Sequence, residues 1–224
     1  RSQYGSIDRH RCMGWLLLLL MSGASATSVT LDFESASTAG VSTGGANGQL
    51  PYPFTWKSGS TASSSTGPST GCGGSGSYYY AETSTNGHSP RASPTTGSVY
   101  TFTYDGSGCP SGVISSIDFC YHMYGSTMGT LSVVNTIWSK SGNQGNSWRA
   151  ETGVIINSAS FSFKYNRGSS YTGDAAIDQV VVNCREAPRP PPLPLPPPSP
   201  PLMPPPPPPP PRMPLTYLPA EAAF

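Results

Sequence analysis

In the centre of the chain, the run Phe119–Val133 (FCYHMYGSTMGTLSV) most constrains what this sequence can fold into. Apolar and polar residues alternate up to Met123, and the alternation resumes at Leu131 after the glycine-bounded segment 125–129. A two-residue period is typical of strands with one buried face, so the run predicts a β-hairpin. The expected buried face holds Ile117, Phe119, Tyr121 and Met123, and the opposite face holds Asp118, Cys120 and His122.

Further strand-like segments recur along the chain, with turn residues between them. They cover residues 29–33, 76–82, 98–104, 158–165 and 175–182. No segment shows a sustained apolar period of 3.6 residues, so the pattern predicts an all-β sandwich or barrel. In contrast, residues 57–76 are almost entirely Ser, Thr and Gly. We expect this stretch to be a long exposed loop that Cys72 ties down.

The first 26 residues are predicted to be an upstream extension followed by a secretory signal peptide. Arg9 and Arg11 precede a short apolar run at 15–21, and Ala24-Ser25-Ala26 then forms a small-x-small cleavage site. The apolar run is much shorter than the roughly 20 residues that a membrane-spanning helix needs. No later run is long enough either, so we expect no transmembrane segment in this chain.

Two further regions follow from composition. Residues 27–187 form one candidate domain, large enough to bury nearly 70% of its unfolded surface. Residues 188–224 hold most of the 26 prolines and are predicted to form an extended, disordered polyproline II tail. We interpret the tail as an extracellular spacer, with docking on an SH3-type groove as the alternative. Its composition resembles the proline-rich stalks of plant and algal wall glycoproteins.

Charge and cysteine content narrow the function further. The net charge is +1, so neither nucleic acid nor an anionic membrane surface is an expected partner. Cys12 lies in the predicted upstream extension, so four cysteines remain in the rest of the chain. Behind a signal peptide, an even number of cysteines indicates disulfides, and four cysteines allow three connectivities. These residues contain no C-x-x-C pair, which argues against zinc. The four are Cys72, Cys109, Cys120 and Cys184.

Five separated motifs resemble, in order, those of the MAM family of extracellular adhesion modules. They lie at 32–34, 53–69, 119–133, 137–148 and 167–182. The residues that carry the resemblance are Phe33, Trp56, Phe119, Tyr121, His122, Met123, Tyr124, Gly125, Trp138, Gly142, Trp148, Gly173 and Asp174. The resemblance implies a jelly-roll sandwich of two antiparallel sheets without catalytic activity. It also implies an extracellular role in cell–cell or cell–matrix contact, with a surface or matrix protein or a second copy as partner.

The cysteines depart from the family pattern. The two early family cysteines are missing, and Leu31 stands at the first position. The central family cysteine falls at Ser116, four residues before Cys120, and residues four apart share a strand face. The resemblance therefore implies a bridge between Cys120 and Cys184, which leaves Cys72 to pair with Cys109.

Few residues suggest chemistry. Asp118, Cys120 and His122 share a strand face, but a disulfide-bonded cysteine cannot act as a nucleophile, so we expect no enzyme activity. No cofactor is required, although a structural calcium ion is a hypothesis because hard cations bind carboxylate oxygens. Its candidate ligands are Asp32, Glu34 and Asp178, with Asp174 nearby; simple solvation or pairing with Arg167 is the alternative.

Two other functions stay open from the sequence. Jelly rolls often bind glycans through exposed aromatic side chains, and Tyr78, Tyr79 and Tyr80 are the candidates here. MAM modules also occur beside metalloprotease domains, so the chain is alternatively an accessory part of a larger secreted enzyme. The sequence does not identify the ligand.

Overall fold

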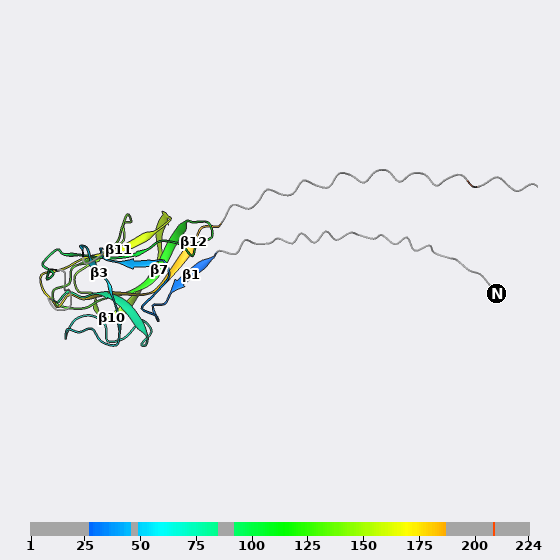
Figure 1. Cartoon of the computed structure of the whole chain (residues 1–224). Coiled ribbons are helices and arrows are strands. Elements are labelled where there is room, and N and C mark those ends of the chain that lie inside the picture. The colour runs from blue at the N-terminus through cyan, green and yellow to red at the C-terminus, as the bar shows by residue number, and fades with distance from the viewer. Residues whose placement is uncertain (1–26, 46–48, 85–91, 187–207, 209–224) are drawn as a thin grey trace, which may run out of the picture. The chain divides into compact units, whose positions relative to one another are not determined.

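The computed structural model describes residues 27–45, 49–84, 92–186 and 208. The predicted signal peptide and almost all of the proline-rich tail lie outside these residues. The described residues form twelve strands in two sheets, and none of them belongs to a helix suited to crossing a membrane (Figure 1). All strand pairings between described residues are antiparallel except one, between β3 (Tyr52–Pro53) and β6 (Val99–Tyr104). The predicted all-β sandwich of two antiparallel sheets is confirmed.

Sheet A has β10 and β4 at its edges, and sheet B has β2 and β9 at its edges. Sheet A runs in the order β10 (Gly145–Ser158), β7 (Ile114–Met123), β12 (Ala175–Cys184), β5 (Ser77–Ala81) and β4 (Thr55–Ser58), with β1 (Ser28–Leu31) paired to β12. Sheet B runs in the order β2 (Val41–Thr43), β6 (Val99–Tyr104), β11 (Phe161–Asn166), β8 (Thr130–Val133) and β9 (Ser139–Ser141), with β3 (Tyr52–Pro53) beside β6.

The central run forms two strands, but the predicted hairpin is wrong. β7 lies in sheet A and β8 lies in sheet B, so the segment between them crosses the sandwich. Gly125 has a φ of 151°, and a Cβ atom there would collide with the carbonyl oxygen of Thr172. The apolar alternation correctly predicts that both parts of this run are strands. It does not predict their pairing partners, because these depend on which sheet buries the apolar face of each strand.

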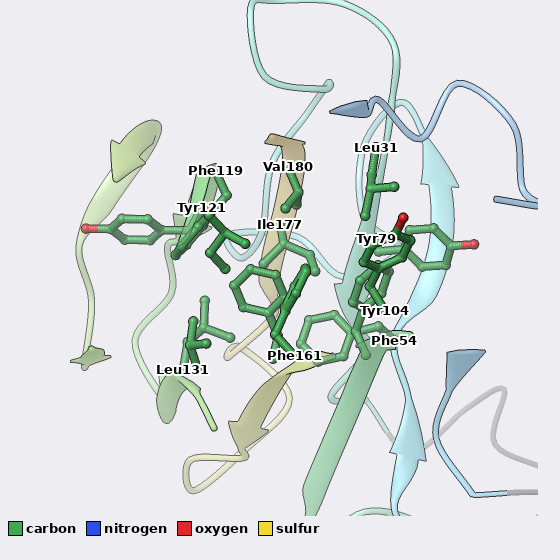
Figure 2. Close-up of a cluster of buried hydrophobic side chains, with 14 of the residues drawn as sticks. Leu31, Phe54, Tyr79, Tyr104, Phe119, Tyr121, Leu131, Phe161, Ile177 and Val180 are labelled. Carbon is green, nitrogen blue, oxygen red and sulfur yellow. The ribbon is translucent and has the colours of Figure 1, made fainter. Parts of the chain in front are cut away.

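The core lies between the two sheets and is rich in aromatic rings. Figure 2 shows side chains from both sheets meeting in one interior. Phe119 of β7 and Phe163 of β11 have ring centroids 4.8 Å apart, and Phe102 of β6 lies 5.3 Å from the ring of Tyr79 of β5. Each fully buried ring contributes roughly 2 to 3 kcal/mol of hydrophobic stabilisation.

The expected exposed loop is in fact packed over the outer face of sheet A. We call residues 59–76 the flap. Thr61 and Thr66 are buried in it, and beneath it lies a second apolar cluster of Tyr78, Tyr80 and Ala176, with Trp148 against it. Cys120 and His122 on the outer face of β7 are therefore buried as well, whereas Ser116 and Asp118 on that face are partly exposed. A Ser, Thr and Gly segment can pack closely because its hydroxyl groups satisfy backbone carbonyls and its glycines occupy little space.

The longest strand, β10, was not predicted from the sequence. Its residues are mostly polar and largely exposed, and its pairing with β7 has three register shifts. An edge strand with bulges has no regular apolar alternation, because each bulge exchanges the two faces. Its position at the edge of sheet A matters for the site described below.

Candidate functional site

The disulfides pair differently from the prediction. Cys72 is joined to Cys120, and Cys109 is joined to Cys184. In the ladder between β7 and β12, Cys120 lies opposite Asp178 and Ile114 lies opposite Cys184. Six residues of β12 thus separate Cys184 from the level of Cys120, which is roughly 20 Å along an extended strand. The predicted Cys120–Cys184 bridge was wrong because a shared strand face does not place two residues at the same level.

Asp32 and Glu34 do not lie on the first strand as expected. β1 ends at Leu31, and Phe33 between the two carboxylates adopts a φ of 57°. Both carboxylates nevertheless act on Asp178, whose pKa is raised to about 6, mainly by burial and further by Glu34 and Asp32. The Asp178 carboxylate accepts the amide N–H of Cys72 at 2.7 Å. No group of three or more Asp, Glu, His or Cys suited to a metal occurs among the described residues. Calcium binding stays a prediction.

Asp174 lies in a different, fully buried polar cluster. Its Oδ1 accepts bonds from the amide of Thr83 at 2.9 Å and from the Thr83 hydroxyl at 2.8 Å, while its Oδ2 is buried without a partner. Arg167 donates to the carbonyl of Thr83. Burial, and then the charge of Glu82, raise the pKa of Asp174 to about 7. This cluster joins the connection that follows β5 to the connection between β11 and β12.

The three tyrosines proposed to bind a glycan are buried, so that prediction is wrong. Tyr79 packs in the main core and donates its hydroxyl to the carbonyl of Ala36, while Tyr78 and Tyr80 lie beneath the flap. Strand residues alternate between the two faces of a sheet, and here both faces are covered. None of the three rings is available as an exposed platform.

The polar face of β7 is also divided among separate partners. Asp118 accepts the amide of Gly153 at 2.6 Å, and Cys120 is in its disulfide. His122 is 2% exposed and packs against Trp148 with ring centroids 5.5 Å apart. Burial lowers the pKa of His122 to about 4. The three side chains therefore do not form a nucleophile–base pair.

Exposed apolar side chains gather at one edge of the sandwich. Of the five large exposed hydrophobic residues in the described part of the chain, Ile137 and Ile155 lie here, and Val134 lines a separate pocket with Ile156 of β10. Ile137 is fully exposed, and Ile155 is 61% exposed. Residues 136–140 and 151–155 line a groove of about 560 Å³ between β9 and β10, the edge strands of the two sheets. We call it the open-edge groove.

Trp138 closes the core at this groove. It is buried, and its ring lies 4.9 Å from Phe119 and 5.4 Å from Tyr121. Lys140 of β9 and Glu151 of β10 form an ion pair at 3.4 Å that links the two sheets. The charges in the groove wall therefore compensate each other, and the groove offers an apolar, neutral contact surface.

Comparison with known proteins identifies the family. The family model "MAM domain, meprin/A5/mu" matches residues 32–186, which is more than half of the chain. The chain belongs to the MAM domain family.

Several curated relatives carry a similar MAM segment. The chain is 48% identical over 66 residues to "MAM and fibronectin type III domain-containing protein 1" of Acropora millepora, which covers 28% of this chain and 15% of the relative. It is 32% identical over 149 residues to "MAM domain-containing glycosylphosphatidylinositol anchor protein 2" of Mus musculus, covering 58% of this chain and 16% of the relative. The chain thus spans less than a fifth of the length of either relative.

A comparison with solved structures gives a limited similarity. The K1 cleaved adhesin domain of Lys-gingipain from Porphyromonas gingivalis W83 matches with a TM-score of 0.45 and 16% identity, covering 71% of this chain and 99% of that domain. This likeness is too distant to support a statement about function.

Most residues that carry the MAM resemblance serve the fold. Trp56 donates its indole N–H to the carbonyl of Phe33, and Trp148 donates to the carbonyl of Thr70, both at 2.8 Å. Those fully or largely buried are Phe33, Phe119, Tyr121, His122, Met123, Gly125, Trp138, Gly173 and Asp174, and those partly exposed are Trp56, Tyr124, Gly142 and Trp148. In this MAM domain, most of these motif residues therefore belong to the scaffold.

Sequence reasoning named Trp138 as a fold residue but did not single out the exposed isoleucines of the open-edge groove. Ile137 is a β-branched residue beside Trp138 in the connection between β8 and β9. Because turns usually hold small or polar residues, an isoleucine in a connection is one sequence signal of an exposed apolar contact. Ile155 follows Val154 in a bulged strand, where the alternation does not tell which side chain points outward. Both become visible as a patch only when the two sheet edges lie side by side.

Proposed function

We propose that this MAM domain is an extracellular, non-catalytic recognition module that binds a cell-surface or matrix protein through the open-edge groove. The observation that carries the proposal is the pair of exposed isoleucines, Ile137 and Ile155, in one groove at the edge of the sandwich. Small soluble domains rarely leave apolar side chains grouped in this way without a partner to cover them. Family membership and relatives named as glycosylphosphatidylinositol-anchored proteins support a place outside the cell.

The groove also defines the chemistry of the partner. Its one ion pair, Lys140 with Glu151, is internally compensated, so no net charge is left to select a charged ligand. Neither Ile137 nor Ile155 offers a hydrogen bond from its side chain. The partner therefore presents an uncharged apolar segment, of the kind that forms the centre of protein–protein interfaces.

Adhesion by beads coated with the full-length secreted chain tests this proposal. Ile137→Asp with Ile155→Asp places two charges in the groove and should abolish binding of coated beads to cells or matrix. Leu50→Asp is the matched control, because Leu50 is an equally exposed apolar residue remote from the groove lining. The double variant should keep its melting temperature, since both isoleucines are largely exposed.

The outcomes separate the kinds of partner. If the coated beads aggregate with one another, the partner is a second copy of this chain. If they bind only to cells or matrix and not to one another, the partner is a different protein. Unchanged adhesion of the folded double variant would contradict the assignment of the groove. An accessory role beside a catalytic domain stays a prediction.

A further inference from the structure

A second pocket lies along the flap. It has a volume of about 350 Å³ and is lined by residues 60–69 together with Tyr124 and Asn146. Every lining residue is uncharged, and most carry a hydroxyl group. A pocket of this chemistry offers many donors and acceptors of hydrogen bonds but no counter-charge for an ionic ligand.

The pocket wall is held in place by hydrogen bonds. Thr61 donates its hydroxyl to the carbonyl of Thr66 at 2.7 Å. The Thr66 hydroxyl and the Gly67 amide both donate to the carbonyl of Tyr124, at 3.0 and 2.9 Å. The disulfide from Cys72 fixes the far end of the flap. A wall built this way is pre-formed, which lowers the entropy lost when a ligand binds.

Ser65 provides an independent observation at the same place. It lines the pocket with a φ of 63°, a left-handed conformation that residues with a side chain rarely adopt. No turn residue such as Gly or Asn occupies the position, although glycines are frequent in this flap. Backbone strain of this kind is found preferentially where a chain positions a binding group.

The side chains point to a class of ligand. Tyr124 is a half-buried aromatic residue of the pocket lining, and Asn146 is an exposed amide residue of the same lining. A ring that packs against apolar C–H faces, beside an amide and several hydroxyls, suits a small, neutral, polyhydroxylated ligand. We propose that the flap pocket binds a neutral sugar unit, independently of the open-edge groove and without the buried Tyr78, Tyr79 and Tyr80.

Saturation-transfer NMR on the full-length secreted chain tests this inference. The probes are the neutral monosaccharides glucose, galactose, mannose, xylose, arabinose and N-acetylglucosamine, each at millimolar concentration, with glucuronic acid as a charged comparison. We expect transfer to at least one neutral sugar. Tyr124→Ala should abolish it, and Asn146→Ala should weaken the affinity at least about tenfold.

The matched control is Tyr171→Ala, which removes an exposed tyrosine that does not line the pocket and should leave sugar binding unchanged. If Tyr124→Ala does not fold, Asn146→Ala decides, because Asn146 is exposed. The inference is overturned if no neutral sugar receives saturation, if only glucuronic acid does, or if folded Asn146→Ala binds as tightly as the parent. Ile137→Asp should not affect sugar binding, so the two proposals fail separately.

Discussion

Cys72 of the flap and Cys120 of β7 are joined by a disulfide, and the carboxylate of Asp178, opposite Cys120 in the ladder, accepts the amide N–H of Cys72. The bridge therefore attaches a segment without strands to the outer face of sheet A. Beneath it lies the aromatic cluster that the flap protects from water. The flap pocket and the burial of this cluster thus depend on the same attachment.

Removing this bridge should loosen the flap and destabilise the domain. The disulfide closes a loop with a sequence separation of 48 residues. For a loop of that size, the entropy model predicts a loss of about 4 kcal/mol in the free energy of unfolding for the double variant Cys72→Ser with Cys120→Ser. Urea unfolding measures the loss, and hydrogen exchange should rise most in residues 59–76. Non-reducing peptide mapping that found Cys120 linked to Cys184 would contradict the pairing.

Phe102 is predicted to be a critical core residue. It is fully buried and contacts the rings of Phe33, Tyr79 and Phe163 at centroid distances of 5.4, 5.3 and 6.1 Å. Phe102→Ala should lower the free energy of unfolding by about 3 to 5 kcal/mol, because burial is lost and a cavity remains. The neighbouring Thr103→Ala, on the outer face of the same strand, should cost much less. Equal losses for the two variants in urea unfolding would show that this face is not the core.

The buried carboxylate of Asp174 should make the domain less stable as the pH rises from about 4 to about 7. Its pKa is raised from 3.8 to about 7 in the folded state, so between these values the folded protein binds more protons than the unfolded protein. Stability from this group is present below its unfolded pKa and is lost as the pH rises through the folded pKa. Asp178, with a pKa of about 6, acts in the same direction at lower pH.

Asp174→Asn tests this effect, since the asparagine keeps an oxygen that can accept the Thr83 bonds. Melting temperatures between about pH 6.5 and pH 8 should fall for the parent and stay nearly constant for the variant. The charged groups that face Asp174 are Glu82 and Arg167. Parallel pH profiles for parent and variant would refute the assignment.

His122 should produce the opposite dependence in mild acid. Its pKa is lowered from 6.5 to about 4, so the unfolded protein binds more protons between these values. Its contribution to stability is therefore lost as the pH falls from 6.5 toward 4. His122→Gln should therefore lose less stability than the parent between pH 6.5 and pH 4, as measured by urea unfolding. Subtracting the variant's stability from the parent's at each pH cancels the contributions of Asp174 and Asp178, which both proteins share. A larger loss in the variant would contradict the expectation.

Regular apolar alternation was a reliable guide to individual strands. Residues 98–104 were expected to form a strand, and β6 is observed at Val99–Tyr104 with three aromatic side chains buried. The last strand was likewise expected at 175–182 and extends to Cys184. Such segments can be read from sequence because the burial of one face fixes the period of the side chains. The strands β9 and β10 were missed because they lie at exposed edges, where no such constraint acts.

By itself, the sequence determined the two-layer β architecture, the family and the aromatic core, because the alternation of side chains and the MAM motifs are local properties of the chain. Only the tertiary structure decided the disulfide partners, the burial of the flap, and the meeting of Ile137 with Ile155 at the open edge. These features depend on which strands are neighbours and at which level they align. That information comes from the packing of distant segments, since no short stretch of sequence contains it.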